Sequence, residues 1–186
     1  GGTMGDVYGG FSTSGNAESN TMRITGGSVT GNVYGGFSTS GNAAGNTVDL
    51  GDISGLKISG AVVGGQGAAA TSNIITLRGT EIGGYIYGGR LADGSSSVTA
   101  ADGNTLNIHD MGAKAQFVEG VQNFNFFLSP KADLTQSMLT LSANLSKDMR
   151  STTLNMAVEG GYAPLRKGDL VSLIKLPDAQ NIVTDA

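Results

Sequence analysis

Four short segments of the chain begin with an asparagine and then alternate between apolar and polar residues. They read NTMRI from Asn20, NTVDL from Asn46, NIITL from Asn73 and NTLNI from Asn104. An alternation with a period of two places successive side chains on opposite faces of a β-strand, so the pattern predicts four strands with one buried face. The residues two and four places after each asparagine are apolar, and we expect them to line one interior column: Met22, Ile24, Val48, Leu50, Ile75, Leu77, Leu106 and Ile108.

A second landmark, an apolar pair followed by two glycines, recurs at similar intervals. It occupies residues 7–10, 33–36, 62–65 and 86–89, and one asparagine-led segment follows each copy. Around the first two copies the eleven residues VYGGFSTSGNA are identical, at an offset of 26 residues. Four repeats therefore cover residues 1–109. A single unit of this kind cannot bury its own apolar face, whereas stacked units can.

The repeats predict an all-β fold, a parallel β-helix (β-solenoid) with about 26 residues per repeat. A leucine-rich repeat has a similar length but needs a run of leucines that is missing here, and a propeller blade needs about 40 residues or more. Strands of successive turns, or rungs, would lie about 4.8 Å apart. We expect the four asparagine-led strands to be parallel and in register, so that identical residues stack as ladders.

Residues 110–186 lack both landmarks but keep strand patterns. These patterns read NFNFFL (123–128), SMLTLSA (137–143), TTLNMAVE (152–159) and GDLVSLIKL (168–176), and SKDMRS (146–151) is interpreted as a polar turn or a short helical excursion. We interpret 110–186 as irregular C-terminal rungs and a cap on the regular repeats of 1–109. Four of the six phenylalanines lie between Phe117 and Phe127. Because larger side chains bury more apolar surface, we expect the C-terminal part to be the stable seed from which the glycine-rich rungs fold.

Composition and charge exclude several classes of function. The chain has 186 residues, of which 31 are glycine and none is cysteine. Frequent glycine disfavours long helices, and the lack of cysteine excludes disulfides and thiolate metal sites. The net charge is −4, and Arg23 is the only basic residue among the first fifty, so a nucleic-acid partner is not expected. No apolar run approaches the roughly 18 residues of a membrane helix. The chain opens inside a repeat without a leader, and we expect it to be a piece of a longer protein.

No motif in the sequence predicts a catalytic, cofactor-binding or metal site. His109 is the only histidine, and one histidine without cysteine cannot build a zinc site, so we expect a solvated surface residue. The segment GQGAAA (65–70) matches the glycine pattern of dinucleotide-binding loops, but the next strand starts too soon for the helix that such a loop must open. We interpret it as a corner of small residues. The phosphate-loop, serine-hydrolase and calcium-nonapeptide patterns do not occur.

The alternative enzymatic reading depends on the outward-facing column of the four strands. That column is formed by Arg23, Asp49, Thr76 and Asn107. A glycoside hydrolase needs two carboxyl groups about 5 to 9.5 Å apart, and the column offers one. We expect Arg23 and Asp49 to form an exposed ion pair between adjacent rungs, worth about 0 to 1 kcal/mol.

Three tyrosines recur at the same place in the glycine landmark. Tyr8, Tyr34 and Tyr87 each precede a pair of glycines. If their rings face outward they can form a stripe that contacts sugars or proteins. The other interpretation is ordinary packing between rungs.

The repeats resemble those of a known family. GGSVTGNVYGGFSTSGNAAGNTVDL (26–50) is similar to repeats in the passenger domains of Gram-negative autotransporters, and VQNFNFFLSP with the later KGDLVSLIK resembles the last passenger rungs. The resemblance implies a right-handed parallel β-helix, export across two membranes, and display at the cell surface or secretion. It also implies a downstream membrane barrel outside this chain.

The resemblance sets the expected function. We expect a non-enzymatic adhesive or self-associating stalk whose partners are host or bacterial surface molecules, protein or glycan, or other copies of itself. The alternative is the scaffold of a β-helical carbohydrate-active enzyme, a polysaccharide lyase or hydrolase.

Overall fold

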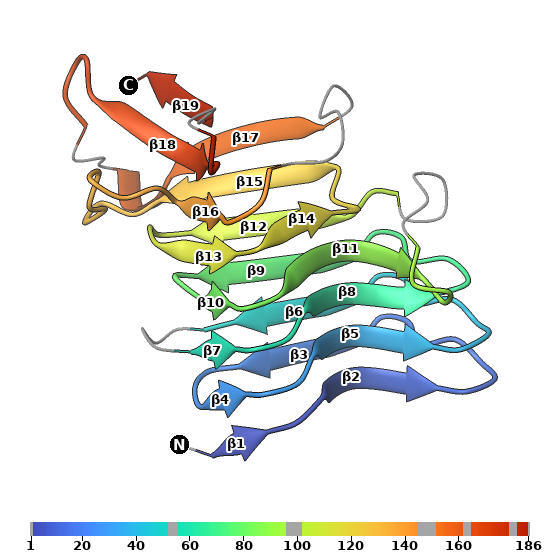
Figure 1. Cartoon of the computed structure of the whole chain (residues 1–186). Helices are drawn as coiled ribbons and strands as arrows, with labels where there is room; N and C mark the ends of the chain where they lie inside the picture. Colours follow the sequence, from blue (N-terminus) through green and yellow to red (C-terminus); the bar gives the residue numbers. More distant parts are fainter. Residues whose placement is uncertain are drawn as a thin grey trace.

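The alternating segments form strands that wind into a parallel β-solenoid. The structure is a computed structural model, and it describes residues 2–51, 56–95, 102–144, 152–161, 165–178 and 182–185. About five turns of about 27 residues each stack along one axis. Figure 1 shows the turns rising from the N-terminal rung to the C-terminal strands. The predicted parallel β-helix is confirmed.

The strands of the described residues form three sheets that run along the solenoid axis, named here A, B and C. Sheet A contains, in order, β1 (Thr3–Met4), β4 (Ser28–Val29), β7 (Lys57–Ile58), β10 (Glu81–Ile82), β13 (Ala113–Ala115), β16 (Leu139–Leu141), β18 (Leu170–Lys175) and β19 (Ile182–Asp185). Sheet B contains β14 (Phe117–Glu119), β11 (Tyr85–Leu91), β8 (Val62–Gly67), β5 (Val33–Ser38) and β2 (Val7–Ser12). Sheet C contains β17 (Thr153–Val158), β15 (Asn123–Leu128), β12 (Thr105–His109), β9 (Ile74–Arg78), β6 (Thr47–Leu50) and β3 (Thr21–Ile24).

The predicted interior column lies on sheet C. Strands β3, β6, β9 and β12 are parallel and in register, so that Met22 pairs with Val48, Val48 with Ile75, and Ile75 with Leu106. Met22 and Ile24 are at most 9% exposed, and the other six predicted residues are fully buried. The prediction of the column and of its register is therefore confirmed.

The asparagine that opens each of these strands is part of a buried ladder. The side-chain oxygen of Asn46 accepts from the backbone and side-chain nitrogens of Asn20, at 3.0 and 2.8 Å. Asn73 accepts in the same way from Asn46, at 2.9 and 3.1 Å, and Asn104 from Asn73, at 2.9 and 3.1 Å. Gln122 ends the ladder by accepting from the backbone nitrogen of Asn104 at 2.9 Å. The side-chain nitrogens of Asn20, Asn46 and Asn73 therefore point toward the next rung along the chain, whereas that of Asn104 donates back to the Ala70 carbonyl at 3.0 Å.

The two sequence landmarks, the glycine pair and the asparagine, pack against each other inside the solenoid. A side-chain carbon added to Gly36 would lie 2.5 Å from the side-chain nitrogen of Asn46, and one added to Gly65 would lie 2.7 Å from that of Asn73. Real carbons do not approach other heavy atoms so closely. The glycine pair thus leaves the space that the asparagine ladder fills, which explains why the two landmarks recur together.

The irregular part of the chain continues the same sheets. All four strand patterns predicted after residue 110 form strands, namely β15, β16, β17 and β18. Strand β15 pairs in parallel with β12 and with β17, while β18 pairs in parallel with β16 and antiparallel with β19. A short 3-10 helix, η1 (Glu159–Gly161), follows β17. The segment 146–151, expected to be a turn or a short helix, lies outside the described residues.

Candidate functional site

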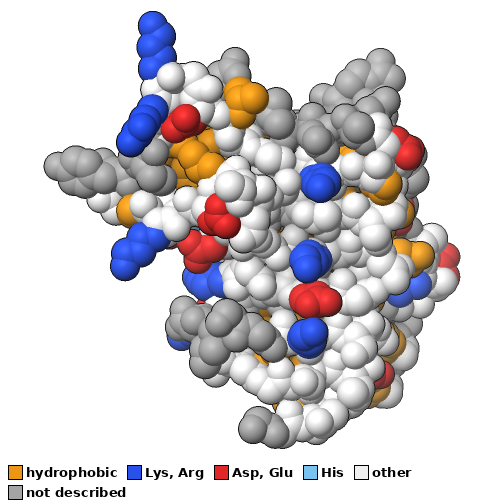
Figure 2. Space-filling model, turned by 60° about the vertical axis from the view of Figure 1, so that its left-hand side comes forward, with side chains coloured by type: hydrophobic (Ala, Val, Ile, Leu, Met, Phe, Trp, Pro, Cys, Tyr) orange, Lys and Arg blue, Asp and Glu red, His pale blue; other side chains and the backbone are white. Residues whose placement is uncertain are grey.

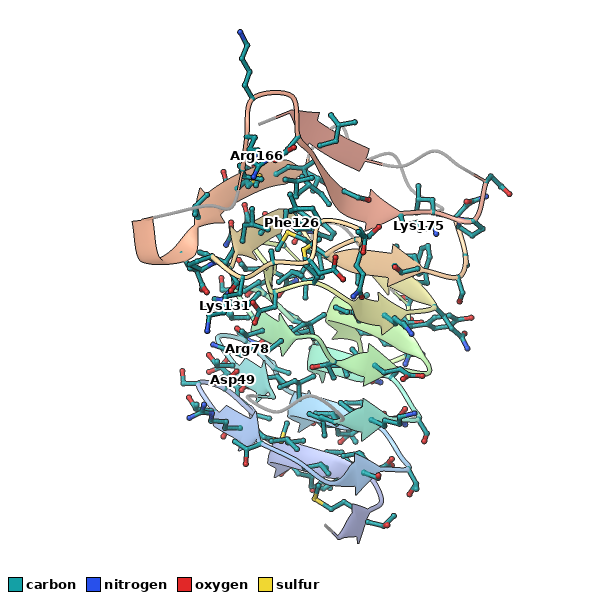
Figure 3. All side chains as sticks on the ribbon, turned by 90° about the vertical axis from the view of Figure 1, so that its left-hand side faces the viewer. Asp49, Arg78, Phe126, Lys131, Arg166 and Lys175 are labelled. Carbon is teal, nitrogen blue, oxygen red and sulfur yellow. The ribbon has the colours of Figure 1, made fainter. Side chains whose placement is uncertain are left out.

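The outer face of sheet C carries an ion-pair cluster. Arg23 lies 3.3 Å from the Asp49 carboxylate, which confirms the predicted pair on adjacent rungs. Arg78 binds the other oxygen of the same carboxylate at 2.6 Å. Figure 3 shows Asp49 and Arg78 on neighbouring turns at the same side of the solenoid. The only acid in this part of the column is therefore held between two guanidinium groups.

The contribution of Arg78 was not predicted from the sequence. It stands at the end of β9, two residues beyond Thr76, which is the register partner of Asp49. Counting residues from the asparagine places Arg78 in another column, and only the length of its side chain brings it back to Asp49.

Farther along the axis the same outer column consists of amides. Asn107 donates to the Thr76 hydroxyl at 3.3 Å, Asn125 donates to Asn107 at 2.9 Å, and Asn155 donates to Asn125 at 2.9 Å. This outer ladder is exposed to solvent at its end, unlike the buried one, since Asn155 is an exposed residue. Arg23, Asp49, Thr76 and Asn107 therefore do lie in one outward column, as predicted.

His109 differs from the expected solvated residue. It lies on the outer face, as predicted, but its side chain is only 17% exposed. The ring stacks on Phe127 with centroids 4.4 Å apart, and Nδ1 lies 2.6 Å from a carboxylate oxygen of Glu159. Packing from the next rung and a contact 50 residues away in the sequence therefore cover most of this histidine.

The GQGAAA segment is a strand end and a corner. Residues 65–67 belong to β8, and β9 begins at Ile74 with no helix between them. A side-chain carbon at Gly67 would lie 2.6 Å from the carbonyl oxygen of Gly41. Close contact with the preceding rung thus accounts for the small residues, as the corner interpretation predicts.

The tyrosine ladder faces outward from sheet B and is interrupted. Tyr8 and Tyr34 stack with centroids 5.0 Å apart and planes 4° apart, but the next register partner is Val63, which lies between Tyr34 and Tyr87. The rings are both packed and exposed, because Tyr8 is 40% exposed. Burial raises the pKa of the Tyr34 hydroxyl, which stays protonated at neutral pH.

Phenylalanines extend this surface beyond the tyrosines. Phe11 and Phe37 stack at 5.5 Å, and Tyr34 contacts Phe37 edge to face at 5.3 Å. Phe11 is 57% exposed. We call Tyr8, Phe11, Tyr34 and Phe37 the aromatic patch. It is an apolar surface on the outer face of sheet B, and its exposed ring edges are available to a partner.

The outer face of sheet A carries a row of charged side chains that the sequence analysis did not identify. In register across five adjacent strands, the row consists of Lys57, Glu81, Lys114, Thr140 and Lys175. Figure 2 shows basic and acidic side chains lined up along this face. The strands of sheet A that carry the first three are only two or three residues long, which is too short for a period-two signal. We call these five residues the lysine row.

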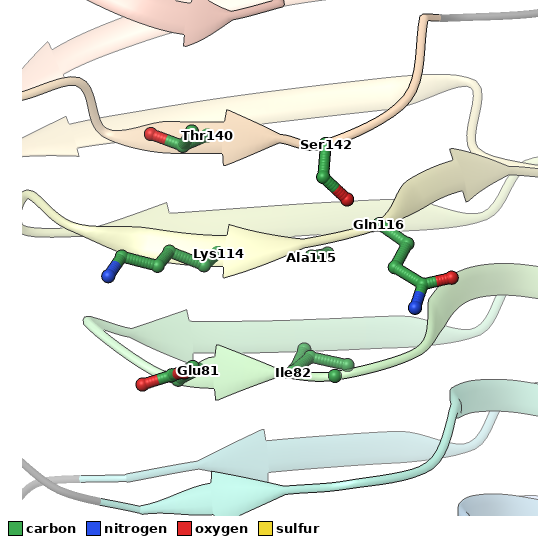
Figure 4. A pocket seen from close by; sticks show the side chains of 8 residues that line it. Glu81, Ile82, Lys114, Ala115, Gln116, Thr140 and Ser142 are labelled. Carbon is green, nitrogen blue, oxygen red and sulfur yellow. The ribbon is translucent and has the colours of Figure 1, made fainter. Parts of the chain in front are cut away.

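A shallow hollow of about 270 Å³ lies beside the lysine row. Ile82, Gly83 and Ala115 contribute to its lining, together with the polar residues Glu81, Lys114, Gln116, Thr140 and Ser142. In Figure 4, Lys114 projects on one side of the hollow, and Gln116 and Ser142 lie on the other. The hollow therefore combines a small apolar floor with polar walls.

The described residues show neither a metal-ligand cluster nor a membrane-spanning helix. Within the ranges that the structure describes, no three His, Asp or Glu side chains gather as metal ligands would. In the same ranges, no helix has the length and hydropathy needed to cross a membrane. No family model, curated protein or solved structure matches the chain.

Proposed function

We propose that this chain is a non-enzymatic, β-helical stalk of an autotransporter-like passenger whose outer ladders adhere to other surfaces or to copies of itself. The aromatic patch carries the proposal. Large exposed apolar side chains that gather on one face favour contact with a partner. The stack of hydrogen-bonded rungs beneath the patch holds its rings at a fixed spacing, so that little side-chain freedom is lost on binding.

The charge arrangement favours a stalk over a carbohydrate-active enzyme. A catalytic carboxylate must accept or donate a proton, or attack the substrate. Asp49 is instead engaged by Arg23 and Arg78, at 3.3 and 2.6 Å. These contacts suit a carboxylate that stabilises neighbouring rungs.

Cell-surface display and a downstream membrane barrel belong to the same proposal. They rest on the resemblance of residues 26–50 and of the C-terminal strands to passenger repeats. The reading frame that follows the chain in its gene tests this part. A barrel-encoding segment there supports the proposal, and an unrelated downstream domain contradicts it.

Adhesion is tested with beads that carry the full chain through a terminal tag. We expect the beads to cluster, or to be retained on a layer of host cells, and Phe11→Ser to reduce this binding. Leu170→Ser is the matched control, because Leu170 is also 57% exposed but lies far away on β18. Beads that neither cluster nor bind would contradict the proposed function. Equal loss with both variants would show that the aromatic patch is not the adhesive surface.

A further inference from the structure

We propose that the lysine row and the adjoining hollow bind an anionic polysaccharide that lies along the solenoid axis. This inference rests on the proposed adhesive function and names the chemistry of one partner. It concerns sheet A, whereas the aromatic patch lies on sheet B.

The charge of the row is opposite to that of the whole chain. The chain has a net charge of −4, yet the row contains Lys57, Lys114 and Lys175 and one acid, Glu81. Glu81 pairs with Lys57 at 3.5 Å. Lys114 and Lys175 are exposed and make no ion pair with any residue in the described ranges. Two ammonium groups are therefore available to anions on a protein whose net charge is negative.

The geometry of the row suits a linear polymer. Register pairing places the lysines on alternate strands, β7, β13 and β18. With strands about 4.8 Å apart, successive lysines are about 9.6 Å apart along the axis. The lysines thus repeat in single file, and an extended chain with regularly spaced anionic groups can meet Lys114 and Lys175 together.

The hollow supplies the contacts that a sugar needs in addition to charge. The side chains of Gln116, Thr140 and Ser142 line it and make no hydrogen bond with the rest of the described chain. Their amide and hydroxyl groups can donate to and accept from sugar hydroxyls. Gly83 also lines the hollow and adds no side chain to it.

The same features disfavour other polyanions. Nucleic acids are bound by clustered basic residues together with aromatic stacking platforms, and the lysine row contains no aromatic residue. A protein partner needs an apolar core in the interface, and this face presents only a small apolar floor. A shallow hollow with polar groups on its walls, beside a line of single charges, fits a polysaccharide better than either.

The test measures binding of the full chain to three polymers by titration calorimetry at low salt. The probes are polygalacturonate with carboxylates, dextran sulfate with sulfates, and uncharged dextran. We expect one or both anionic polymers to bind, and uncharged dextran not to bind. Binding should weaken as salt shortens the screening length. Carboxylate or sulfate selectivity then identifies the anionic group.

Substitutions locate the site. Lys114→Gln and Lys175→Gln should each lower the affinity about fivefold, which corresponds to ~1 kcal/mol for an exposed charge contact. Ser142→Ala should lower it without changing the salt dependence. Lys131→Gln is the matched control, since Lys131 is also exposed and Figure 3 shows it on the opposite side from Lys175.

Three results would overturn the inference: no binding of either anionic polymer, an equal loss with Lys131→Gln, or equally tight binding of single-stranded DNA. Bead adhesion that persists in the absence of polymer binding would reject the polysaccharide site and leave the adhesive stalk standing. If the beads do not adhere but the anionic polymers still bind, the adhesive-stalk proposal is rejected and the polysaccharide site is retained.

Discussion

Asn46, Asn73 and Asn104 are polar side chains that the fold buries completely. Burial of an amide is unfavourable unless its donors and acceptors are paired. Here each side-chain oxygen accepts two hydrogen bonds, one from a backbone nitrogen and one from a side-chain nitrogen of the preceding rung. The asparagines thus replace backbone pairing at a corner where the chain leaves one sheet and enters the next.

Replacing one residue of this ladder should be costly. In Asn73→Ala, the backbone and side-chain nitrogens of Asn46 lose their acceptor inside the protein. We expect the free energy of unfolding to fall by about 3 kcal/mol, because each buried donor left unpaired costs about 1–3 kcal/mol. Urea denaturation measures the change.

Asn155→Ala is the control for this experiment, because Asn155 makes the same kind of contact on the exposed outer ladder. Its effect should stay within about 0.5 kcal/mol. Similar losses for the two variants would mean that the buried ladder has no special role.

The glycines that face the ladder should tolerate no side chain. In Gly36→Ala the new carbon would lie 2.3 Å from the carbonyl oxygen of Ala17 and 2.5 Å from the Asn46 side chain. We expect a loss of about 2–3 kcal/mol, in the upper part of the usual range for overpacking. Gly5→Ala, with no heavy atom within 4 Å of the new carbon, should be neutral within about 0.5 kcal/mol. A neutral Gly36→Ala in the same denaturation assay would refute the packing argument.

Single strands and their register could be predicted wherever the number of residues after the asparagine is the same in each repeat. Equal spacing from the asparagine placed Met22 over Val48 and Arg23 over Asp49, because neighbouring parallel strands align equivalent residues. The reason for the glycine pairs was not predicted. Their space is limited by a side chain from a different sheet, and a pattern within one strand contains no information about that neighbour.

The register of strands could not be predicted from the sequence where the number of residues between successive rungs changes. Consecutive ladder residues are separated by 26, 27 and 31 residues, and then by only 18 between Asn104 and Gln122. After that point the register no longer follows from the sequence. The contact of His109 with Glu159 and the alignment of Lys114 with Lys175 both depend on this shifted register.

The ion-pair cluster on sheet C stabilises three adjacent strands, β3, β6 and β9. Asp49→Asn removes its contacts with both Arg23 and Arg78. We expect a loss of about 1 kcal/mol at low salt, since partly exposed ion pairs contribute little. At about 1 M salt, where the screening length is about 3 Å, most of the difference from the parent protein should vanish.

Denaturation in low and in high salt measures this difference. Glu81→Gln, which removes a single more exposed pair with Lys57, should have a smaller effect. A salt-independent loss in Asp49→Asn would point to packing rather than charge.

At the scale of the whole molecule, the two parts of the chain differ in their largest buried side chain. Leucine and isoleucine are fully buried in both parts, as Leu50 and Leu128 show, but the fully buried phenylalanine, Phe126, lies in the C-terminal part. In a solenoid, folding can start at the most stable rung and spread to its neighbours. The proposal that the C-terminal part is the seed remains a prediction.

Folding kinetics can locate the seed. Phe126→Ala should destabilise the protein by about 3–5 kcal/mol, and mainly by slowing folding. Val48→Ala should destabilise it by about 2 kcal/mol, and mainly by accelerating unfolding. Stopped-flow refolding and unfolding in urea measure both rates. If Val48→Ala instead slows folding and Phe126→Ala only accelerates unfolding, the repeats are the seed.

Residues 7–17 and 33–43 have identical sequences, so either segment can take the place of the other in its rung. Val33 and Tyr34 of β5 pair with Val7 and Tyr8 of β2, so each copy already offers the surface that the other one requires. Removing residues 8–33 would join Val7 to Tyr34 and leave an uninterrupted sequence that is one rung shorter. The protein can thus become one rung shorter or longer by deletion or duplication between the two identical segments, and the sequence at the join stays the one already present.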